Sequence, residues 1–365
     1  MGRQSCSGGI ATIGEVLKGR ATPQGTSRYT SRFPVQSEAG FYRRVQGCWA
    51  SSLGIGTYLG APDEATDTAY VMAIKAAVHG GINFIDSAIN YRHQRSERSI
   101  GAALSEMVRA EEITRDQVII CTKAGFLVPG AVPHDGLKPS DIAGQMHSMA
   151  PAFLADQIER SRENLNLETI DVFYLHNPES QLAYVSRETF EQRIRDAFTL
   201  LEGLVEQGRI GWYGTATWEG YRATGQLSLS RMVEIATEVA GSSHHFRFVQ
   251  LPFNMAMPEA FLRRSEVVRG QECTVLQAAQ EFGITVVASA SLLQARLASH
   301  LPEEIVQKIP EASTNAQRAI QFTRSTPGIS VALSGMSSVA HLIENLKVST
   351  VPPLSLDRYL SFYRA

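Results

Sequence analysis

The stretch Gly81-Ile-Asn-Phe-Ile-Asp86-Ser-Ala-Ile-Asn-Tyr91 is an apolar run that ends in an acidic residue. Its centre predicts a short buried strand, and Asp86 marks the C-terminal end of that strand. Tyr91 follows in a polar loop. In a barrel of parallel strands, the loops at the C-terminal strand ends carry the chemistry, so both side chains are candidates for an active site.

Two further apolar runs end in the same way, one at Lys123 and the other at His176. We therefore expect these two side chains on the same rim as Asp86 and Tyr91. Taken singly, each residue also has an ordinary structural explanation, such as a strand-end cap, a solvated charge or a core histidine. Their joint occurrence at three strand ends favours a tuned proton donor, and hence an enzyme.

Short apolar runs alternate with longer amphipathic stretches from residue 51 onward. Such runs, apolar throughout, are typical of strands covered on both faces. The predicted strands are Leu53–Thr57, Phe84–Asp86, Val118–Thr122, Asp171–Leu175, Gly211–Gly214, Phe248–Leu251, Thr285–Ala288 and Ser330–Leu333.

A helix is expected after each strand. The predicted helices are Ala65–His79, Ser96–Val108, Phe153–Leu165, Arg187–Gln207, Arg231–Val239, Val275–Phe282, Thr314–Arg324 and Val339–Leu346. Eight such pairs predict an α/β fold, a single (β/α)₈ TIM barrel. An open doubly wound sheet is the alternative, but it requires a G-x-G-x-x-G fingerprint, and the glycines of 54–60 have the wrong spacing.

Residues 1–45 are rich in Gly, Ser, Thr, Gln and Arg without a sustained period. We interpret them as an N-terminal extension that lies across the domain or is partly disordered, and residues 46–365 as the barrel. The long connection of residues 125–151 follows the strand that ends in Lys123. Because it contains several prolines and glycines and lies on the expected active rim, it is interpreted as a substrate-covering loop.

The composition excludes several function classes. A formal net charge of -2 gives no basic footprint for nucleic acid, and no apolar run approaches the roughly 20 residues that span a membrane. The four cysteines are scattered without metal-ligand spacing, and His244-His245 has no ligand companions, so no metal is expected. The N-terminus lacks the apolar core of a secretory signal, which together with the cysteines predicts a cytoplasmic protein.

The sequence resembles the aldo-keto reductase family from about residue 51 to about residue 346. The family motif G-x-x-x-x-D-T/S-A-x-x-Y corresponds to Gly81–Tyr91 and is followed by Ser96-Glu97 and Gly101. Cys-Thr-Lys-Ala-Gly at 121–125 and Tyr-Leu-His-Asn-Pro at 174–178 match its lysine and histidine segments. Gln250 in Phe-Val-Gln-Leu-Pro-Phe-Asn at 248–254, and Gly335 with Glu344-Asn345, match further family positions. Five motifs in the right order make the resemblance specific.

The resemblance implies a nicotinamide cofactor that donates hydride to an aldehyde or ketone, or accepts it from an alcohol. It implies Tyr91 as the general acid/base, assisted by Lys123, Asp86 and His176. The residues agree with that chemistry, because a nearby ammonium stabilises phenolate; we therefore expect Lys123 to lower the pKa of Tyr91 from its usual value near 10. The implied cofactor contacts are Gly56, Thr57, Asn177, Thr217, Gln250, Ser289, Ser291, Leu292, Gly335, Ser337, His341, Glu344 and Asn345.

The chain departs from the family pattern around the nicotinamide. Ala216 and Thr217 replace the usual Ser-Asn pair, and Ser289 replaces the usual stacking aromatic. The ring would then be held differently, with Trp218 or Phe253 as candidates for the missing face.

Two other segments depart from the pattern. The segment 92–95 is longer than usual, so its basic side chains either enter the substrate cavity or form a solvated turn. The loop after the eighth strand lacks the usual cation for a 2′-phosphate, so NADP(H) is favoured with NAD(H) as the alternative.

Two other functions stay open at this point. A Schiff-base lyase would use Lys123 as its nucleophile. A regulatory or binding barrel would hold a nucleotide tightly and turn it over slowly. The expected partner in the leading interpretation is a small-molecule carbonyl or alcohol; the oligomeric state is not predicted.

Overall fold

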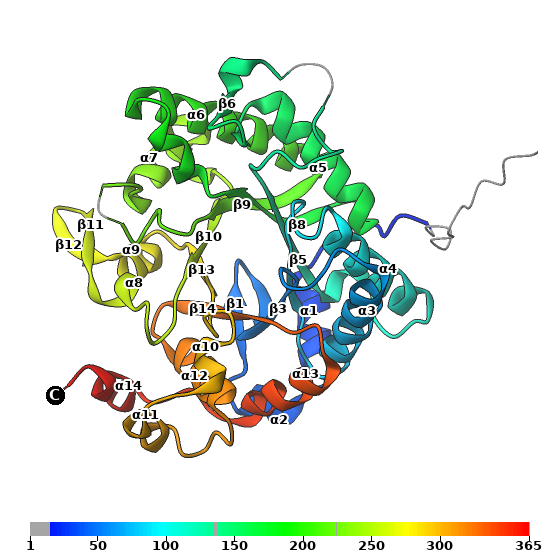
Figure 1. Cartoon of the computed structure of the whole chain (residues 1–365), viewed down its shortest axis with the longest axis vertical. Helices are drawn as coiled ribbons and strands as arrows, with labels where there is room; N and C mark the ends of the chain where they lie inside the picture. Colours follow the sequence, from blue (N-terminus) through cyan, green and yellow to red (C-terminus); the bar gives the residue numbers. More distant parts are fainter. Residues whose placement is uncertain (1–14, 134–136, 224, 365) are drawn as a thin grey trace, which may run out of the picture.

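The computed structural model describes residues 15–133, 137–223 and 225–364. Eight parallel strands form a closed barrel in the order β10-β13-β14-β3-β4-β5-β8-β9 (Figure 1). The strands are β3 (Leu53–Gly56), β4 (Phe84–Asp86), β5 (Ile119–Ala124), β8 (Ile170–His176), β9 (Ile210–Ala216), β10 (Phe246–Pro252), β13 (Thr285–Ser289) and β14 (Ile329–Gly335). Because the sheet closes on itself, the prediction of a (β/α)₈ barrel is confirmed and the open doubly wound sheet is excluded.

Helices surround the strands in an outer ring (Figure 1). Those that follow the barrel strands are α3 (Glu64–His79), α4 (Arg95–Arg109), α5 (Pro151–Leu165), α6 (Arg187–Glu206), α7 (Leu229–Ala240), α9 (Val275–Glu281), α12 (Asn315–Ser325) and α13 (Val339–Leu346). Side-chain caps explain several starts: Asp63 accepts from the Thr66 amide before α3, and Thr274 forms a capping box before α9.

The barrel interior is packed rather than hollow. Phe84, Tyr174, Phe248, Val331 and Leu333 belong to one buried cluster inside the strands. Such filling is usual for an eight-stranded barrel, whose bore is only wide enough for side chains. Ligands therefore have access only at the rims.

Residues 15–51 close the N-terminal end of the barrel. They form α1 (Pro23–Thr30), α2 (Pro34–Glu38) and an antiparallel hairpin of β1 (Tyr42–Val45) and β2 (Cys48–Ser51). Val45 and Cys48 belong to the same buried cluster as the barrel interior. The described part of the extension is thus folded across the barrel floor, and the boundary expected at residue 45 lies inside the hairpin. Cys6 lies outside the described residues.

Smaller elements complete the chain between the barrel units. They are η1 (Arg115–Gln117), η2 (Pro139–Asp141), β6 (Ile142–Ala143), β7 (His147–Ser148), η3 (Pro178–Ala183), η4 (Gly241–Ser243), α8 (Glu259–Leu262), β11 (Arg264–Val268), β12 (Gln271–Thr274), α10 (Arg296–Ser299), α11 (Glu303–Lys308), η5 (Lys347–Thr350), α14 (Leu356–Leu360) and η6 (Ser361–Tyr363). Within the described ranges, no helix is long and apolar enough to cross a membrane.

Candidate active site

A buried ion pair lies between neighbouring strands at the C-terminal rim. Lys123 Nζ on β5 lies 2.6 Å from Asp86 Oδ2 at the end of β4, and it also donates to the Ser87 carbonyl at 2.6 Å. Gln250 on β10 donates to the other carboxylate oxygen of Asp86 at 2.8 Å, from across the barrel. Partners from three strand ends thus hold the Lys123 ammonium and both carboxylate oxygens of Asp86, so the lysine has little freedom to move.

The electrostatics keep Lys123 charged. Burial lowers the pKa of its ammonium, but the charge of Asp86, together with Tyr91 and the hydrogen bond to Asp86, outweighs burial and raises it above its usual value. A buried charge is tolerated only when it is paired in this way. The site therefore holds a positive charge below the cavity.

Tyr91 lies directly beside this charge. Lys123 Nζ is 5.1 Å from the centroid of the Tyr91 ring. The ring packs edge-on against Tyr58, at 4.9 Å between centroids, and against His176, at 5.9 Å. The loop that carries Tyr91 is fixed by left-handed backbone at residues 92–94.

The direction of the Tyr91 pKa differs from the expectation. Burial raises the pKa of the phenol above 10.0, and although Lys123 lowers it, Asp86 adds to the rise and the net direction is upward. The expected net lowering by Lys123 was therefore wrong, because desolvation of a phenolate outweighs one neighbouring ammonium whose charge is shared with Asp86. At neutral pH the hydroxyl keeps its proton.

His176 ends strand β8 and is neutral. Burial lowers the pKa of its imidazole well below 6.5, and the charge of Lys123 adds to this. Its ring packs edge-on against Phe126, with 5.1 Å between centroids. A neutral imidazole at this place can orient a substrate oxygen by a hydrogen bond but is not a strong acid.

A cavity of about 490 Å³ opens above these residues. Tyr91, Asp86 and His176 line it, and Lys123 lies beneath. Of the expected cofactor contacts, the following line the cavity: Gly56, Thr57, Asn177, Thr217, Gln250, Ser289, Ser291, Leu292 and Gly335. The cavity is not lined by Ser337, His341, Glu344 or Asn345. Ser337 lies between β14 and α13, and the other three lie in α13. The cavity is large enough for a ligand, and it brings together strand ends from the whole barrel.

The segment 92–95 does not supply a cation to the cavity. Arg92 is buried and forms an ion pair with Asp67 at 2.8 Å, while Arg95 binds the other oxygen of that carboxylate at 2.6 Å. His93 is exposed. Of the two alternatives for this segment, entry into the cavity does not hold, because none of these side chains lines it. Both arginines instead bind Asp67 on α3.

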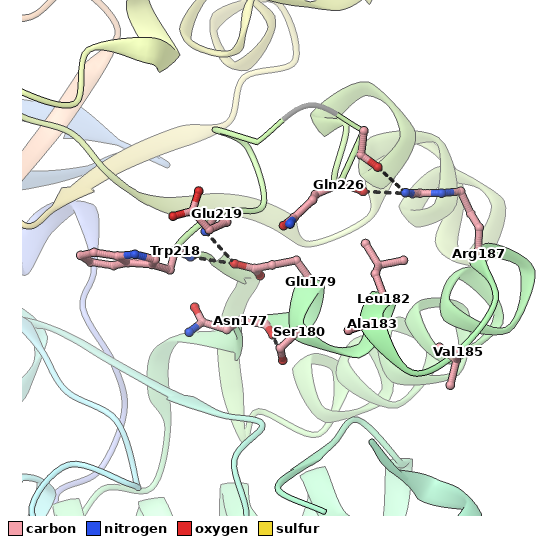
Figure 2. A pocket seen from close by; sticks show the side chains of 11 residues that line it. Asn177, Glu179, Ser180, Leu182, Ala183, Val185, Arg187, Trp218, Glu219 and Gln226 are labelled. Atoms are coloured by element: carbon pink, nitrogen blue, oxygen red, sulfur yellow. Dashed lines mark hydrogen bonds between the residues drawn. The ribbon is translucent and has the colours of Figure 1, made fainter. Parts of the chain in front are cut away.

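The two aromatic candidates for the nicotinamide face are separated by the structure. Phe253 is fully buried and stacks on Phe322, so it does not line the cavity. Trp218 lines it with its ring partly exposed. The backbone amides of residues 218–220 all donate to Glu179 Oε1, at 2.8, 3.0 and 3.1 Å, so a buried carboxylate holds this loop in place. Figure 2 shows the bonds from Trp218 and Glu219.

Comparison with known proteins identifies the family. Residues 52–311 match the model described as the Aldo/keto reductase family. The chain belongs to this family.

Solved aldo/keto reductase structures share the fold at low sequence identity. An enzyme from Klebsiella pneumoniae in complex with NADP and acetate is 19% identical, with a TM-score of 0.62, over 87% of this chain and 92% of that one. A glycerol dehydrogenase from Gluconobacter oxydans is 19% identical, with a TM-score of 0.64, over 89% and 94% of the two chains. An aldo-keto reductase from Bacillus halodurans in its holo form is 17% identical, with a TM-score of 0.62, over 88% and 95%. At these identities the likeness shows the fold.

Some residues of this aldo/keto reductase site were missed by sequence reasoning. Tyr58 and Asn90 line the cavity and adjoin the expected Thr57 and Tyr91, so their positions beside motif residues were a usable signal. Phe126, in the long connection of residues 125–151, also lines it. Its role as a cavity wall depends on how that connection folds, and no local pattern predicts this.

Two other histidines of the aldo/keto reductase chain form hydrogen bonds with neighbouring side chains and have a structural role. His245 binds Glu202 at 2.7 Å, and His244 accepts from Arg247 at 2.9 Å. Across the parts of the chain that the structure describes, no group of three or more His, Cys, Asp or Glu residues is placed to hold a metal. Burial raises the pKa of the Cys121 thiol well above its usual value, so this residue is a core side chain rather than a nucleophile.

Proposed function

We propose that this aldo/keto reductase reduces an aldehyde or ketone with a reduced nicotinamide cofactor, or runs the reverse reaction, with Tyr91 as the general acid/base. Family membership makes the protein an oxidoreductase; the substrate class and residue roles are the proposal. The observation that carries it is the buried Asp86–Lys123 pair beside Tyr91 at the floor of an open cavity.

The residues divide the work of moving one proton. When bound, the cofactor supplies the hydride. Tyr91 gives its proton to the carbonyl oxygen, where negative charge develops, and Lys123 stabilises the phenolate that remains. Asp86 fixes the lysine, Gln250 fixes Asp86, and neutral His176 orients the substrate oxygen.

The raised pKa of Tyr91 suits the reductive direction. A phenol that stays protonated at neutral pH can donate its proton. The charge of Lys123 then stabilises the Tyr91 phenolate that forms during the reaction, which is absent from the free enzyme. The reverse reaction needs the phenolate as a base, so its rate should rise with pH toward the raised pKa.

The residues around the cavity fit a dinucleotide. Ser291 Oγ, Ser334 Oγ and Asn90 Oδ1 are buried at its wall and have no hydrogen-bond partner among the residues that the structure describes. Buried polar atoms without partners are costly, and a polar ligand can satisfy them once the wall adjusts. Glycines at 56 and 335 leave the backbone open to close approach. Ser289 stands where the family usually has an aromatic residue that stacks on the nicotinamide. Trp218 would cover one face of the ring instead.

NADP(H) is the favoured cofactor, with NAD(H) as the alternative. Structural neighbours from Klebsiella pneumoniae are described in complex with NADP and with NADPH. In this chain Ser337 and His341, at the start of α13, would approach a 2′-phosphate, and Glu344 and Asn345 would approach the adenine. A helix N-terminus and hydroxyls can bind phosphate without a lysine or arginine.

The lyase alternative is disfavoured by the state of Lys123. Schiff-base formation needs a neutral amine, usually obtained by desolvation or by a cationic neighbour. Here Lys123 faces a carboxylate and its pKa is raised. The amine is also already hydrogen-bonded to Asp86 and to a backbone carbonyl.

Titration of tryptophan fluorescence with NADPH and NADH tests the cofactor. Trp218 lines the cavity, so binding should quench its emission, more strongly at low concentration for the preferred cofactor. A panel of aldehydes and ketones is then reduced with that cofactor by the wild type and by Tyr91→Phe. The variant should bind the cofactor normally and lose turnover by at least about 100-fold. Full activity of Tyr91→Phe would overturn the proposed role.

A further inference from the structure

A chain of hydrogen bonds runs from helix α6 to the rim of the barrel that carries the candidate catalytic residues. Arg193 on α6 donates to Gln181 Oε1 at 2.6 Å. Gln181 Nε2 lies 3.0 Å from His147 Nδ1, and His147 Nε2 lies 2.7 Å from the backbone carbonyl of His176. His147 and Gln181 are completely or almost completely buried.

The chemistry of the two end groups determines which atom donates and which accepts in every hydrogen bond of this chain. A guanidinium only donates and a carbonyl only accepts. The Gln181 oxygen must therefore face Arg193 and its amide nitrogen must donate to Nδ1 of His147, which leaves Nε2–H to donate to the carbonyl of His176. Burial, and to a smaller extent Arg193, lower the pKa of the His147 imidazole to about 4, so it is neutral as this arrangement requires.

The carbonyl that His147 holds belongs to a turning point of the backbone. Strand β8 ends at His176, and Asn177 adopts left-handed backbone with φ 47° and ψ 55°. The Asn177 amide donates to Ala216 on β9 at 2.6 Å, so the sheet fixes one side of this peptide and His147 fixes the other. The orientation of that peptide fixes the backbone from which the His176 side chain extends.

Packing around the two histidines agrees with this role. The Phe126 ring packs edge-on against both imidazoles, at 5.2 Å from His147 and 5.1 Å from His176. A Cβ at Gly125 would lie 2.5 Å from His147 Nε2 and 2.6 Å from the His176 carbonyl oxygen. The hydrogen bond thus occupies the space that a side chain at 125 would need.

We propose that His147 is a positioning residue: it anchors the end of β8 and thereby sets His176 for its contact with the substrate oxygen. This inference rests on the proposed function, in which His176 orients the carbonyl. The connection of residues 125–151, expected only to cover the substrate, thus also supports the catalytic rim from behind. It does so through β7, which is joined to residues 125–127 by backbone hydrogen bonds.

Substitutions at 147 separate the hydrogen bonds from the ring. His147→Leu removes both bonds, whereas His147→Gln can donate to the carbonyl and accept from Gln181. We expect His147→Leu to lower kcat by up to about 100-fold, the cost of a small misplacement, while cofactor affinity stays at the wild-type value. His147→Gln should recover most of the rate. Equal rates for wild type and His147→Leu, or no rescue by glutamine, would refute the positioning role.

Gly125→Ala is a second probe that leaves the imidazole intact. Its methyl group would push His147 and the His176 carbonyl apart, so the same selective loss of kcat is expected. This variant decides the matter if His147→Leu does not fold. Normal kcat in folded Gly125→Ala would count against the proposal.

A spectroscopic measurement tests the chain without turnover. In ¹⁵N-histidine-labelled protein at neutral pH, the His147 resonances, assigned by their loss in His147→Gln, should show a neutral ring protonated at Nε2. A ring protonated at Nδ1 would overturn the proposal. If the wild type reduces no carbonyl compound, the proposed function fails, while this spectrum still tests the chain of hydrogen bonds. If Tyr91→Phe is inactive but His147→Leu is active, only the positioning role of His147 fails.

Discussion

Lys123 Nζ lies 2.6 Å from Asp86 Oδ2, and the two side chains are only 1% and 4% exposed. The pair joins neighbouring strands and holds a positive charge under the phenol of Tyr91. Ion pairs buried this deeply cost desolvation and are weak evidence for stability. Its place under the cavity floor argues that it is retained for chemistry.

Replacing Lys123 by methionine should abolish activity and destabilise the fold. Turnover should fall by at least about 100-fold, because the phenolate loses its stabilising charge. The free energy of unfolding should fall by about 3–5 kcal/mol, because Asp86 is left as an unpaired buried charge. Steady-state kinetics and urea unfolding measure the two effects.

The double variant Lys123→Met/Asp86→Leu separates the two effects. Removing the stranded carboxylate should restore most of the stability, while activity stays lost. If the double variant were as unstable as the single one, the loss would come from packing and not from the unpaired charge.

The barrel strands were predictable because burial on both faces leaves a strong signal. All eight were expected within two residues of their observed bounds, and Asp86, Lys123 and His176 followed as strand-end residues. The motif spacing added Tyr91, whose loop has no periodicity of its own.

The remaining features depend on partners that are distant in the sequence. Residues 15–51 have no period, because their order comes from long-range contacts such as the bond from the Tyr29 hydroxyl to the Val78 carbonyl. Arg92 could not be placed without knowing that Asp67 on α3 faces it. The upward shift of the Tyr91 pKa could not be predicted, because it depends on how deeply the phenol is buried and the sequence does not give this.

Glu179 should control the position of Trp218 at the cavity wall. Glu179→Ala removes the acceptor of three backbone amides, so the loop of residues 218–220 should loosen (Figure 2). We expect lower Trp218 fluorescence anisotropy and about 3- to 10-fold weaker cofactor binding, on the scale of one or two net hydrogen bonds. The measurement uses a Trp49→Phe/Trp212→Phe background, which leaves Trp218 as the reporter.

Glu179→Gln is the matched control, because its Oε1 can still accept from the three amides. It should keep anisotropy and binding near the starting values. Equal loosening in the glutamine and alanine variants would show that the carboxylate charge, rather than the shared acceptor, holds the loop.

A close approach of two strands at Gly214 should make this position intolerant of any side chain. A Cβ there would lie 1.8 Å from the Phe248 carbonyl oxygen on the neighbouring strand β10. Gly214→Ala should destabilise the protein by about 3 kcal/mol or more, because the backbone of β9 and β10 must separate. Urea unfolding measures this.

Gly203→Ala is the control for that substitution. Gly203 lies in α6, and in the part of the chain that the structure describes no atom outside its own helix lies within 4 Å of a Cβ added there. Alanine should stabilise this helix by about 0.5–1 kcal/mol. Similar effects of the two alanines would contradict the strand-contact explanation.

Stability should fall as the pH drops from 6.5 toward 4, in part because of His147. Its folded pKa of about 4 lies below the unfolded value near 6.5, so the unfolded chain binds more protons in this window and stability rises with pH. The contribution of this residue amounts to roughly 2 kcal/mol between pH 7.5 and pH 5.

Urea unfolding at these two pH values should therefore show a smaller difference in the free energy of unfolding for His147→Gln than for the wild type. His300→Gln, at an exposed position, should keep the wild-type difference. An unchanged difference in His147→Gln would mean that His147 titrates alike in both states, and hence that it is not held neutral between Gln181 and the His176 carbonyl.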